Sequence, residues 1–339
     1  MNSATVSTQL SLGIVVLNWN AREDSLACLA RLVPQCAGGD TVVLVDNGSQ
    51  DGSVDAVRAR FASVRIVENG ANLGFAGGVN AGLRTVLEAR TDLVLVLNND
   101  TEPPDDFLAR LRETMARRGA DVVQPLLVSA FDTTRIDSAG LGVRWLPGAR
   151  DLNHGEPVSS LDGAGPRAVF GACGAALCCT TRMLREVGLF DEDLFVLFED
   201  VELAFRIRAA GHEVVLVPDL RLPHRRGVSA SRGARSTVAR ARRRFWLQRN
   251  IVALALRAWP WPRLLIGAPI LALRAVWALW LQGAHGPRSC GPLWRRSLRM
   301  RAALRSGLRR HRVDRWLGVR APLACDADAL RHAVGEASQ

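Results

Sequence analysis

The chain has 339 residues, 48% of them hydrophobic, so it can bury a sizeable core and is not disordered throughout. Its net charge of +11 is unevenly distributed: residues 1–230 hold 22 Arg against 29 Asp and Glu, whereas residues 231–339 hold 22 Arg against four acids. No Lys occurs, and no acidic residue lies between Leu220 and Val313. We predict an acidic catalytic or binding part, 1–230, and a basic part, 231–339, that meets an anionic surface such as nucleic acid or lipid.

The seven cysteines show no metal-type pairing such as C-x2-C, and two of them, Cys178 and Cys179, are adjacent. We interpret them as reduced, mostly buried thiols of a cytosolic protein. The N-terminus lacks a basic segment, and its first apolar run, 12–17, is too short for the core of a signal peptide. We therefore do not expect secretion.

Short apolar runs alternate with helical patterns over the first hundred residues. The predicted strands are 12–17, 41–46, 63–69 and 92–100. Apolar spacing predicts helices between them at 24–32, 54–61 and 79–89, the last after a Gly-rich turn. Continuous apolar strands separated by helices indicate an α/β fold with a mostly parallel, helix-covered sheet.

The next part of the chain has a weaker pattern. Residues 130–168 are expected to be rich in loops, and 171–179 to form a buried strand. Short helices are predicted around 183–187 and 201–208, the second ending at Gly211. Residues 212–218 return to a strand, and His224 lies just beyond it.

Polar side chains follow each of the first four predicted strands. Asn18 and Asn20 follow the first, Asp46 the second, the Gly-rich segment the third, and Asn98 to Asp100 the fourth. Ligands of such sheets bind at the carboxyl ends of the strands. This convergence predicts a binding site at one edge of the sheet.

The segment NLGFAGGVNAG (72–82) does not match the dinucleotide fingerprint G-x-G-x-x-G. Its glycines allow close backbone approach and leave N–H groups at a helix start, which suits a phosphate or a sugar ring. A tight strand-to-helix turn would explain the same residues.

Packing explains Asp100 poorly, because this acid follows a five-residue apolar run and precedes a turn. A carboxylate facing a diphosphate would hold a hard divalent cation, which could stabilise a leaving group. Asn98 or Asn99 could add an amide oxygen or a water contact. His224 could be a second cation ligand, or a solvated neighbour of the two arginines that follow it.

Six carboxylates lie within the segment FDEDLFVLFEDVEL. Some are ordinary charges favoured at a helix N-terminus. Glu199 and Asp200, however, have apolar neighbours on both sides, so we expect at least one of them to face a cleft. A pocket carboxylate near an acceptor hydroxyl is the expected general base of a group transfer.

Together these segments resemble the family-2 nucleotide-sugar glycosyltransferases of the GT-A fold, and among them the bacterial rhamnosyltransferase-like group. The likeness covers residues 12–226 and is carried by IVVLNWN (14–20), VVLVDNGSQDGS (42–53), ENGANLGFAGGVNAG (68–82), LVLNNDTEP (95–103), GACGAAL (171–177), GLFDEDLFVLFEDVELAFRIRAAGHEV (188–214) and VPDLRLPH (217–224). The resemblance implies inverting transfer from a nucleoside diphosphate sugar, assisted by Mg2+ or Mn2+, without a covalent enzyme intermediate.

The resemblance also implies roles for single residues. Asp200 matches the catalytic base, with Glu199 beside it, and Asp100 and His224 match metal ligands. Asp100 is the last acid of the family's metal motif, whose first acid is here Asn98. The residues expected to bind the nucleotide sugar are Asn18, Asn20, Asp46, Asn72, Gly74, Phe75, Gly77, Asn80, Asn98, Asn99 and Gly174.

The basic C-terminal part combines Trp, Arg and aliphatic residues. Its longest charge-free window, 275–286, is shorter than the ~20 apolar residues of a spanning helix. We predict helices that lie in a membrane interface, making the protein peripheral on the cytoplasmic face. Helices packed on the catalytic part, and a span containing Arg274, are alternatives.

A lipid-linked acceptor such as a polyprenyl-diphosphate oligosaccharide would suit such a membrane-bound enzyme. By resemblance, the first choice of donor is dTDP-rhamnose, followed by UDP-linked galactose. Nucleotidyl transfer to a sugar phosphate, and a degenerate sugar-binding scaffold, are alternative functions. Nucleic acid is not expected as a partner, since no groove-reading motif accompanies the Arg-rich tail.

Overall fold

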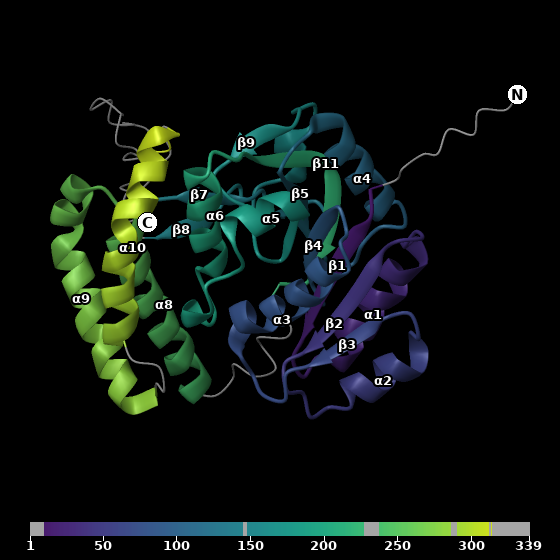
Figure 1. The fold of residues 1–339 in the computed structure, drawn as a ribbon, viewed down its shortest axis with the longest axis horizontal. Coiled ribbons are helices and arrows are strands. Elements are labelled where there is room, and N and C mark those ends of the chain that lie inside the picture. Colours follow the sequence, from purple (N-terminus) through teal and green to yellow (C-terminus); the bar gives the residue numbers. More distant parts are fainter. Residues whose placement is uncertain (1–9, 145–147, 227–236, 286–289, 312, 314–339) are drawn as a thin grey trace, which may run out of the picture.

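The computed structural model describes residues 10–144, 148–226, 237–285, 290–311 and 313. They form a helix-covered sheet and, at one end of the molecule, an array of three long helices (Figure 1). The strands are β1 (Leu12–Asn18), β2 (Thr41–Asp46), β3 (Arg65–Glu68), β4 (Leu93–Asn98), β5 (Val122–Ser129), β6 (Ile136–Ser138), β7 (Leu141–Val143), β8 (Ala149–Asp151), β9 (Arg167–Val169), β10 (Ala176–Thr180) and β11 (Val214–His224). The α-helices are α1 (Arg22–Leu32), α2 (Ser53–Arg60), α3 (Gly74–Glu88), α4 (Phe107–Arg118), α5 (Thr181–Val187), α6 (Glu199–Ala209), α8 (Thr237–Ala258), α9 (Trp261–His285) and α10 (Cys290–Arg310).

The main sheet has nine strands in the order β3-β2-β1-β4-β10-β5-β11-β9, with β6 paired to β5. The pairs β1–β2, β1–β4, β2–β3 and β5–β11 are parallel. β10 runs antiparallel between β4 and β5, and β9 is antiparallel at the edge. The predicted fold class, a mostly parallel helix-covered sheet with a C-terminal helical extension, is confirmed.

The central strands are apolar on both faces because successive side chains point to opposite sides of the sheet. Leu44 belongs to a buried cluster that includes Leu29 of α1. The next residue, Val45, belongs to the cluster on the other face, with Leu83 of α3. Helices on both faces therefore explain the continuous apolar runs of the sequence.

Three of the differences between predicted and observed boundaries affect the site. Helix α3 begins at Gly74 and not at residue 79, so the Gly-rich segment forms the first turns of a helix. The predicted strand 171–179 is observed as β10, which begins only at Ala176 and ends at Thr180. β11 continues past residue 218, through an irregularity between Val217 and Arg221, and ends at His224. His224 is therefore held by sheet pairing.

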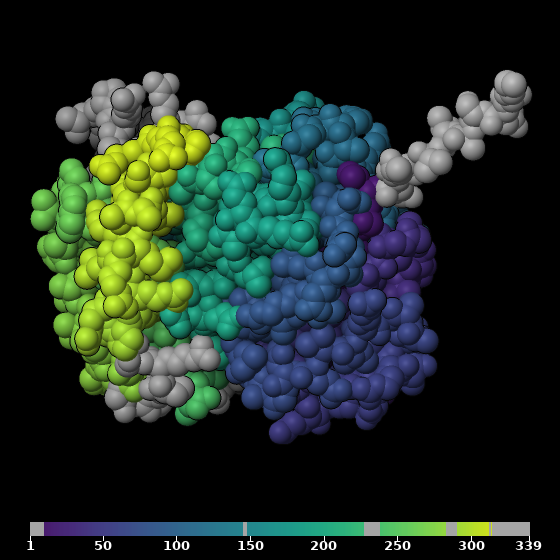
Figure 2. Space-filling model, viewed as in Figure 1, coloured from purple at the N-terminus to yellow at the C-terminus, as the bar shows by residue number. Residues whose placement is uncertain are grey.

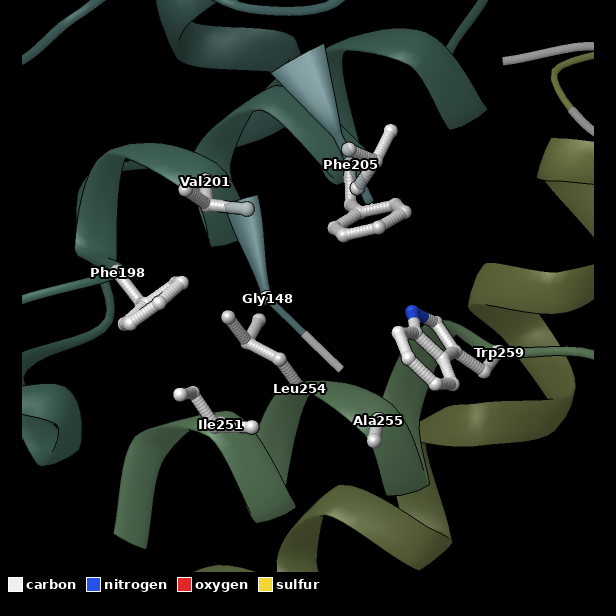
Figure 3. A pocket seen from close by; sticks show the side chains of 9 residues that line it. Gly148, Phe198, Val201, Phe205, Ile251, Leu254, Ala255 and Trp259 are labelled. Atoms are coloured by element: carbon white, nitrogen blue, oxygen red, sulfur yellow. The ribbon is translucent and has the colours of Figure 1, made fainter. Parts of the chain in front are cut away.

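Helices α8 and α10 pack on the catalytic part. This was one of the two alternatives to helices that lie in a membrane interface. Val201 and Phe205 of α6 face Ile251 and Leu254 of α8 across a gap of only about 10 Å³ (Figure 3). α9 lies outside α8, and α9 and α10 form one end of the molecule (Figure 2).

Among the described residues, one helix is long and apolar enough to cross a membrane by length and composition, Trp261–Gln282 of α9. The sequence argument counted only residues free of charge, 275–286, and found too few to span a membrane. By length and composition that prediction was wrong, because α9 also includes the residues before Arg274 and around Arg263. Gly286, at the end of the counted window, lies outside the described residues.

Six cysteines lie in the described part of the chain, and all six are free thiols. Five of them, including Cys178 and Cys179, are buried, in agreement with the prediction. Burial raises the pKa of the Cys179 thiol to about 12, so this side chain is an inert part of the core. Cys325 lies outside the described residues.

Candidate active site

The predicted site residues gather at one edge of the sheet. In the parallel register Asn18 pairs with Asp46, and Leu17 with Asn98, so three strands end side by side. The antiparallel strand β10 starts at this same edge, where the Asn98 amide donates to the carbonyl of Ala175 at 2.9 Å. The topology thus brings together segments that are far apart in the sequence.

Asp46 anchors a network of polar side chains at this edge. Its Oδ1 accepts from Asn18 at 2.9 Å, and its Oδ2 accepts from the Ser49 amide at 2.9 Å. Asn18 in turn accepts from Ser25 at 2.8 Å and from Asn99 at 3.3 Å. Asn18 and Asn99 are buried, so they order the loops at the ends of β1, β2 and β4.

Asn20 connects two of these loops. It has a φ of +50°, its amide donates to Ser49 Oγ at 2.9 Å, and its Oδ1 accepts from the Gln50 amide at 2.8 Å. The residue is exposed at the rim of the β1 and β2 ends. This position suits the rim of a nucleoside pocket.

Contacts with neighbouring protein groups explain the glycine at the start of α3. Asn72 Oδ1 accepts from the Gly74 amide at 2.8 Å. Gly74 has a φ of +76°, and a Cβ there would overlap the carbonyl oxygen of Phe195. The Ala76 amide donates to that carbonyl at 3.2 Å. We predicted that the N–H groups at the start of α3 face a ligand. This is wrong for the Ala76 N–H group, because it donates to the loop before α6.

Three more residues predicted to bind the nucleotide sugar contact neighbouring protein groups. A Cβ on Gly77 would lie 2.9 Å from Leu73 Cβ, and one on Gly174 would lie 3.3 Å from the Phe75 ring. Phe75 contacts Phe190 edge-on at 5.7 Å between ring centroids. Small residues here allow close packing beside the site.

Asn80 forms hydrogen bonds with the loop after α5. Its Oδ1 accepts from the Phe190 amide at 3.0 Å, and its Nδ2 donates to the Phe190 carbonyl at 2.9 Å. It lines a different cavity, with Arg84 and Glu192. The side chain therefore holds the loop after α5, and its contact with the sugar stays a prediction.

The two candidate catalytic acids open helix α6. Asp200 Oδ2 accepts from the Gly174 amide at 3.1 Å, and Oδ1 from the Val201 amide at 2.7 Å. Burial raises the pKa of Asp200 to about 6, although these two amides oppose the shift. Burial and the Asp200 charge raise the pKa of Glu199 well above its usual value. In the described part of the chain, Glu199 Oε2 is buried without a hydrogen-bond partner.

A cavity of about 210 Å³ lies against this acid pair. Asp151, Cys173 and Arg226 line it together with apolar groups that include Leu197 and Phe198. A carboxylate with a pKa near 6 in such a cavity suits proton abstraction at neutral pH.

Asp100 and His224 are in direct contact. The pairing of β11 with residues 100–102 sets them together, and His224 Nε2 lies 3.1 Å from Asp100 Oδ1. His224 Nδ1 lies 2.8 Å from Asp137 Oδ2. Burial alone would lower the pKa of His224, but its hydrogen bonds to Asp100 and Asp137 raise it to about 9.

This pair fits a hard divalent cation. Cis ligands at Mg2+ bond lengths are about 3 Å apart, close to the 3.1 Å between the imidazole nitrogen and the carboxylate oxygen. A carboxylate on the other imidazole nitrogen is the usual support of a metal-binding histidine. Within the described ranges no cluster of three His, Cys, Asp or Glu could hold a metal, so other ligands would come from substrate and water.

Asp137, Asp151 and Arg226 were missed by sequence reasoning. Arg226 Nε lies 2.9 Å from Asp137 Oδ1, and its Nη2 also contacts Asp151. This chain of contacts runs from His224 to the cavity beside Asp200. No spacing signal links these positions, because the two acids lie in the weakly patterned segment 130–168.

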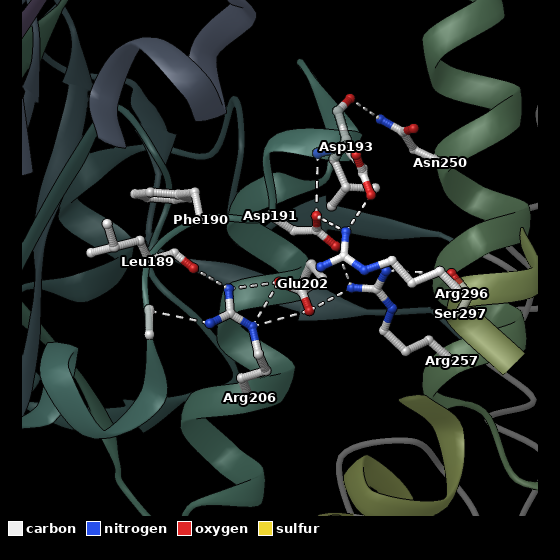
Figure 4. A network of polar contacts seen from close by, with 12 residues as sticks. Leu189, Phe190, Asp191, Asp193, Glu202, Arg206, Asn250, Arg257, Arg296 and Ser297 are labelled. Atoms are coloured by element: carbon white, nitrogen blue, oxygen red, sulfur yellow. Dashed lines mark hydrogen bonds and ion pairs between the residues drawn. The ribbon is translucent and has the colours of Figure 1, made fainter. Parts of the chain in front are cut away.

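The loop before the acid pair is held by the C-terminal helices. Phe195, Leu197 and Phe198 have φ values of +65°, +70° and +71°. Asn250 of α8 donates to the carbonyls of Leu194 at 2.9 Å and of Leu197 at 2.7 Å. Asp191, Glu202, Arg257 and Arg296 form the adjoining ion-pair network (Figure 4).

Two family models match the chain. Residues 13–170 match "Glycosyl transferase family 2" and residues 93–294 match "Glycosyl transferase family group 2". The chain belongs to the family-2 glycosyltransferases. The resemblance inferred from the sequence motifs is confirmed, and this family-2 chain is a sugar-transferring enzyme.

Curated relatives and a solved structure agree with the family. An N-acetylglucosaminyl-diphospho-decaprenol L-rhamnosyltransferase of Mycobacterium tuberculosis is 27% identical over 225 residues, covering 59% of this chain and 71% of the relative. The dTDP-rhamnosyl transferase RfbF of Shigella flexneri is 23% identical over 188 residues, covering 54% and 59%. The mannosyltransferase PcManGT of Pyrobaculum calidifontis, solved with GDP-Man and Mn2+, matches with a TM-score of 0.52 and 20% identity, covering 91% and 88%; it supports the fold.

Proposed function

We propose that the protein is an inverting glycosyltransferase that moves a sugar from a nucleoside diphosphate sugar to a hydroxyl of a lipid-linked glycan. The observation that carries this proposal is the placement of a buried acid with a pKa of about 6, Asp200, and a carboxylate–imidazole pair, Asp100 and His224, at the same sheet edge. Residues 1–230 are the catalytic part and residues 231–339 the membrane-associating part.

Asp200 is the general base in this proposal. The amides of Gly174 and Val201 fix its carboxylate at the wall of the cavity. An acceptor hydroxyl placed there gives its proton to Asp200 as the anomeric carbon gains oxocarbenium character. Burial and the Asp200 charge raise the pKa of Glu199, which disfavours a second negative charge next to the acceptor.

Asp100 and His224 would hold the divalent cation, with Asn98 at the end of β4 nearby. The cation, Mg2+ or Mn2+, would offset the charge that develops on the leaving diphosphate. Asp137 orients the imidazole so that Nε2 faces Asp100. Asp46 and Asn18 would form the base of the nucleoside pocket, and Asn20 its rim.

The donor and acceptor are proposed from the relatives. Two relatives are described as rhamnosyltransferases, and one of them as using a decaprenol diphosphate acceptor. We therefore propose dTDP-rhamnose as the donor and a polyprenyl-diphosphate-linked glycan as the acceptor, with UDP-linked galactose as the second choice of donor. The product would enter cell-envelope polysaccharide synthesis.

Helix α9 supports action at a membrane, which we propose to be at its cytoplasmic face. Its two internal arginines turn inward: Arg263 lies over the Trp259 ring and Arg274 donates to Gln248. Every exposed position from 261 to 280 is apolar: Trp261, Pro262, Leu265, Ile266, Ala268, Pro269, Ala272, Leu273, Val276, Trp277, Leu279 and Trp280. We propose that this face enters the bilayer interface while the opposite face packs on α8.

A thermal-shift panel of nucleotides and nucleotide sugars with Mn2+ tests the donor, followed by transfer to a polyprenyl-diphosphate-linked acceptor. Stabilisation by dTDP-rhamnose and formation of a glycosylated lipid would support the proposal. Donor hydrolysis without acceptor separates an enzyme with an unknown acceptor from a degenerate scaffold. If no nucleotide sugar stabilises or reacts, the proposed donor class is wrong.

A further inference from the structure

The cavity beside Asp200 is small. Its volume of about 210 Å³ is below the roughly 300–1,000 Å³ of pockets that enclose drug-sized ligands. Asp151 of β8 forms one part of its lining, Leu197 and Phe198 form another, and Arg226 forms a third. A single sugar ring therefore suits this space, and the other residues of a glycan would lie outside it.

Two acids hold Arg226 beside this cavity. Its Nε lies 2.9 Å from Asp137 Oδ1, and its Nη2 donates to Asp151. A guanidinium is a rigid planar fork, so these two contacts fix the directions of all its N–H groups. The side chain is still 41% exposed. Arg226 is thus oriented before a ligand arrives and remains accessible to it.

The contacts of Arg226 do not use all of its donors. A guanidinium has five N–H donors, and the two acids engage Nε and Nη2. Among the residues that the structure describes, Nη1 has no hydrogen bond. Nη1 can therefore donate to the oxygen atoms of a ligand in the cavity.

Glu199 brings a second polar group to the same cavity. The residue is only 7% exposed, and within the described ranges its Oε2 is buried without a hydrogen-bond partner. A buried polar atom in this state is unfavourable, and native proteins contain few of them. A ligand hydroxyl that reaches Oε2 would therefore stabilise the complex.

Apolar side chains complete the lining. They include Leu141, Leu197 and Phe198, and Phe198 also borders the narrow gap toward α8 (Figure 3). Asn250 supports this wall through its hydrogen bond to the Leu197 carbonyl. A sugar ring has an apolar C–H face and hydroxyls around its edge. Its chemistry matches a cavity that combines an apolar wall with a few placed polar groups.

We propose that Arg226 is a specificity residue of the transfer, which donates from Nη1 to a hydroxyl of the terminal sugar of the acceptor. Glu199 Oε2 contacts a second hydroxyl, and the ring lies against Phe198 with its attacking hydroxyl at Asp200. The inference rests on the proposed function, because it takes this cavity as the acceptor subsite. The ligand class is one polyhydroxyl ring at the end of a glycan.

Saturation-transfer NMR of the full chain with methyl glycosides tests the contact without donor or transfer. The probes are the methyl glycosides of rhamnose, glucose, galactose, mannose and N-acetylglucosamine. We expect at least one ring to bind the wild type, and Arg226→Gln to weaken that binding about tenfold. Arg221→Gln is the matched control, because Arg221 is an exposed arginine of β11 outside the cavity. The control should change binding less than twofold.

Monodeoxy analogues of the ring that binds show whether the contact is direct. Removing the hydroxyl that Arg226 reaches should weaken wild-type binding about tenfold, but binding to Arg226→Gln less than twofold, since both changes remove the same hydrogen bond. If Arg226→Gln does not fold, Arg226→Lys takes its place, because it keeps the charge and loses the planar fork. Additive losses for every analogue would overturn the role of Arg226.

Failure of this inference is distinguishable from failure of the proposed function. Binding of none of the methyl glycosides to the wild type would overturn the sugar subsite. Stabilisation by dTDP-rhamnose with Mn2+ is measured on the same samples, and its absence would count against the proposed donor while leaving the ring-binding result to stand.

Discussion

Arg257 of α8 and Glu202 of α6 form a buried ion pair, with 2.7 Å between Nη1 and Oε1. The same guanidinium nitrogen lies 2.8 Å from Asp191 Oδ2, and all three side chains are at most 5% exposed (Figure 4). The pair joins the basic C-terminal part to the helix that begins with the candidate catalytic acids. The C-terminal helices are therefore part of the catalytic structure as well as a proposed membrane contact.

Arg257→Ala should strongly destabilise the fold. It leaves Glu202 and Asp191 buried without this partner, and breaking a buried pair costs about 3–5 kcal/mol. The control is Arg296→Ala, which removes a half-exposed partner of Asp191 and should cost at most about 1 kcal/mol. Urea unfolding measures both free energies. Equal losses would show that the buried pair adds no more stability than the surface one.

Asp200→Asn should abolish transfer while nucleotide binding persists. Loss of a general base lowers turnover by about 10²–10⁴-fold, and the amide keeps the shape of the carboxylate. Asp193→Asn is the control, since Asp193 is an exposed acid of the same segment. Turnover and the thermal shift by dTDP are measured for both. Near-full turnover of Asp200→Asn would rule out this base.

The acid limb of the pH profile should reflect Asp200. Its pKa is raised to about 6 by burial first, with a contribution from Asp151. Because the base acts when deprotonated, kcat/KM should fall as the pH drops through about 6. Asp151→Asn removes part of the upward shift, so this limb should move to lower pH. A wild-type rate that stays constant between pH 5 and 8 would contradict the assignment.

Asp137→Asn should weaken the response to Mn2+ without removing a metal ligand. Asp137 holds His224 Nδ1 at 2.8 Å, and loss of such support costs about 10–100-fold in metal affinity or activity. The Mn2+ concentration for half-maximal transfer is the measurement. Asp132→Asn, an exposed acid of the same region, should leave it unchanged. An unchanged Mn2+ requirement in Asp137→Asn would indicate that His224 is not a ligand.

Asn250→Asp should lower turnover by disturbing the loop before α6. The carboxylate cannot donate, and it would face the carbonyls of Leu194, Val196 and Leu197, which the Asn250 amide now contacts. The left-handed φ values of this loop need such support. We expect the pH limb of Asp200 to shift in this variant. Arg243→Ala, an exposed change on α8, is the control. A drop in stability with an unchanged pH profile would indicate a structural role alone.

Continuous apolar runs such as 93–97 were sufficient to predict β1, β2 and β4, because burial on both faces leaves no polar alternation. The edge strand β3 and the helices between these strands were predicted as well. Helix α4 and strand β5 were not predicted from the apolar pattern. The short strands β6 to β9 were also missed, because their stability depends on partners far along the chain.

The sequence by itself determined the family, the strand ends that carry Asn18, Asp46 and Asp100, and the acid pair at Glu199 and Asp200. Only the tertiary structure decided that Asp137 supports His224, because contacts between residues 87 positions apart follow from sheet register and not from spacing. It also decided that Asn80 holds a loop and that the arginines of α9 turn inward. Local patterns are set by burial and backbone geometry, whereas these pairings depend on which surfaces meet when the sheet and the C-terminal helices pack.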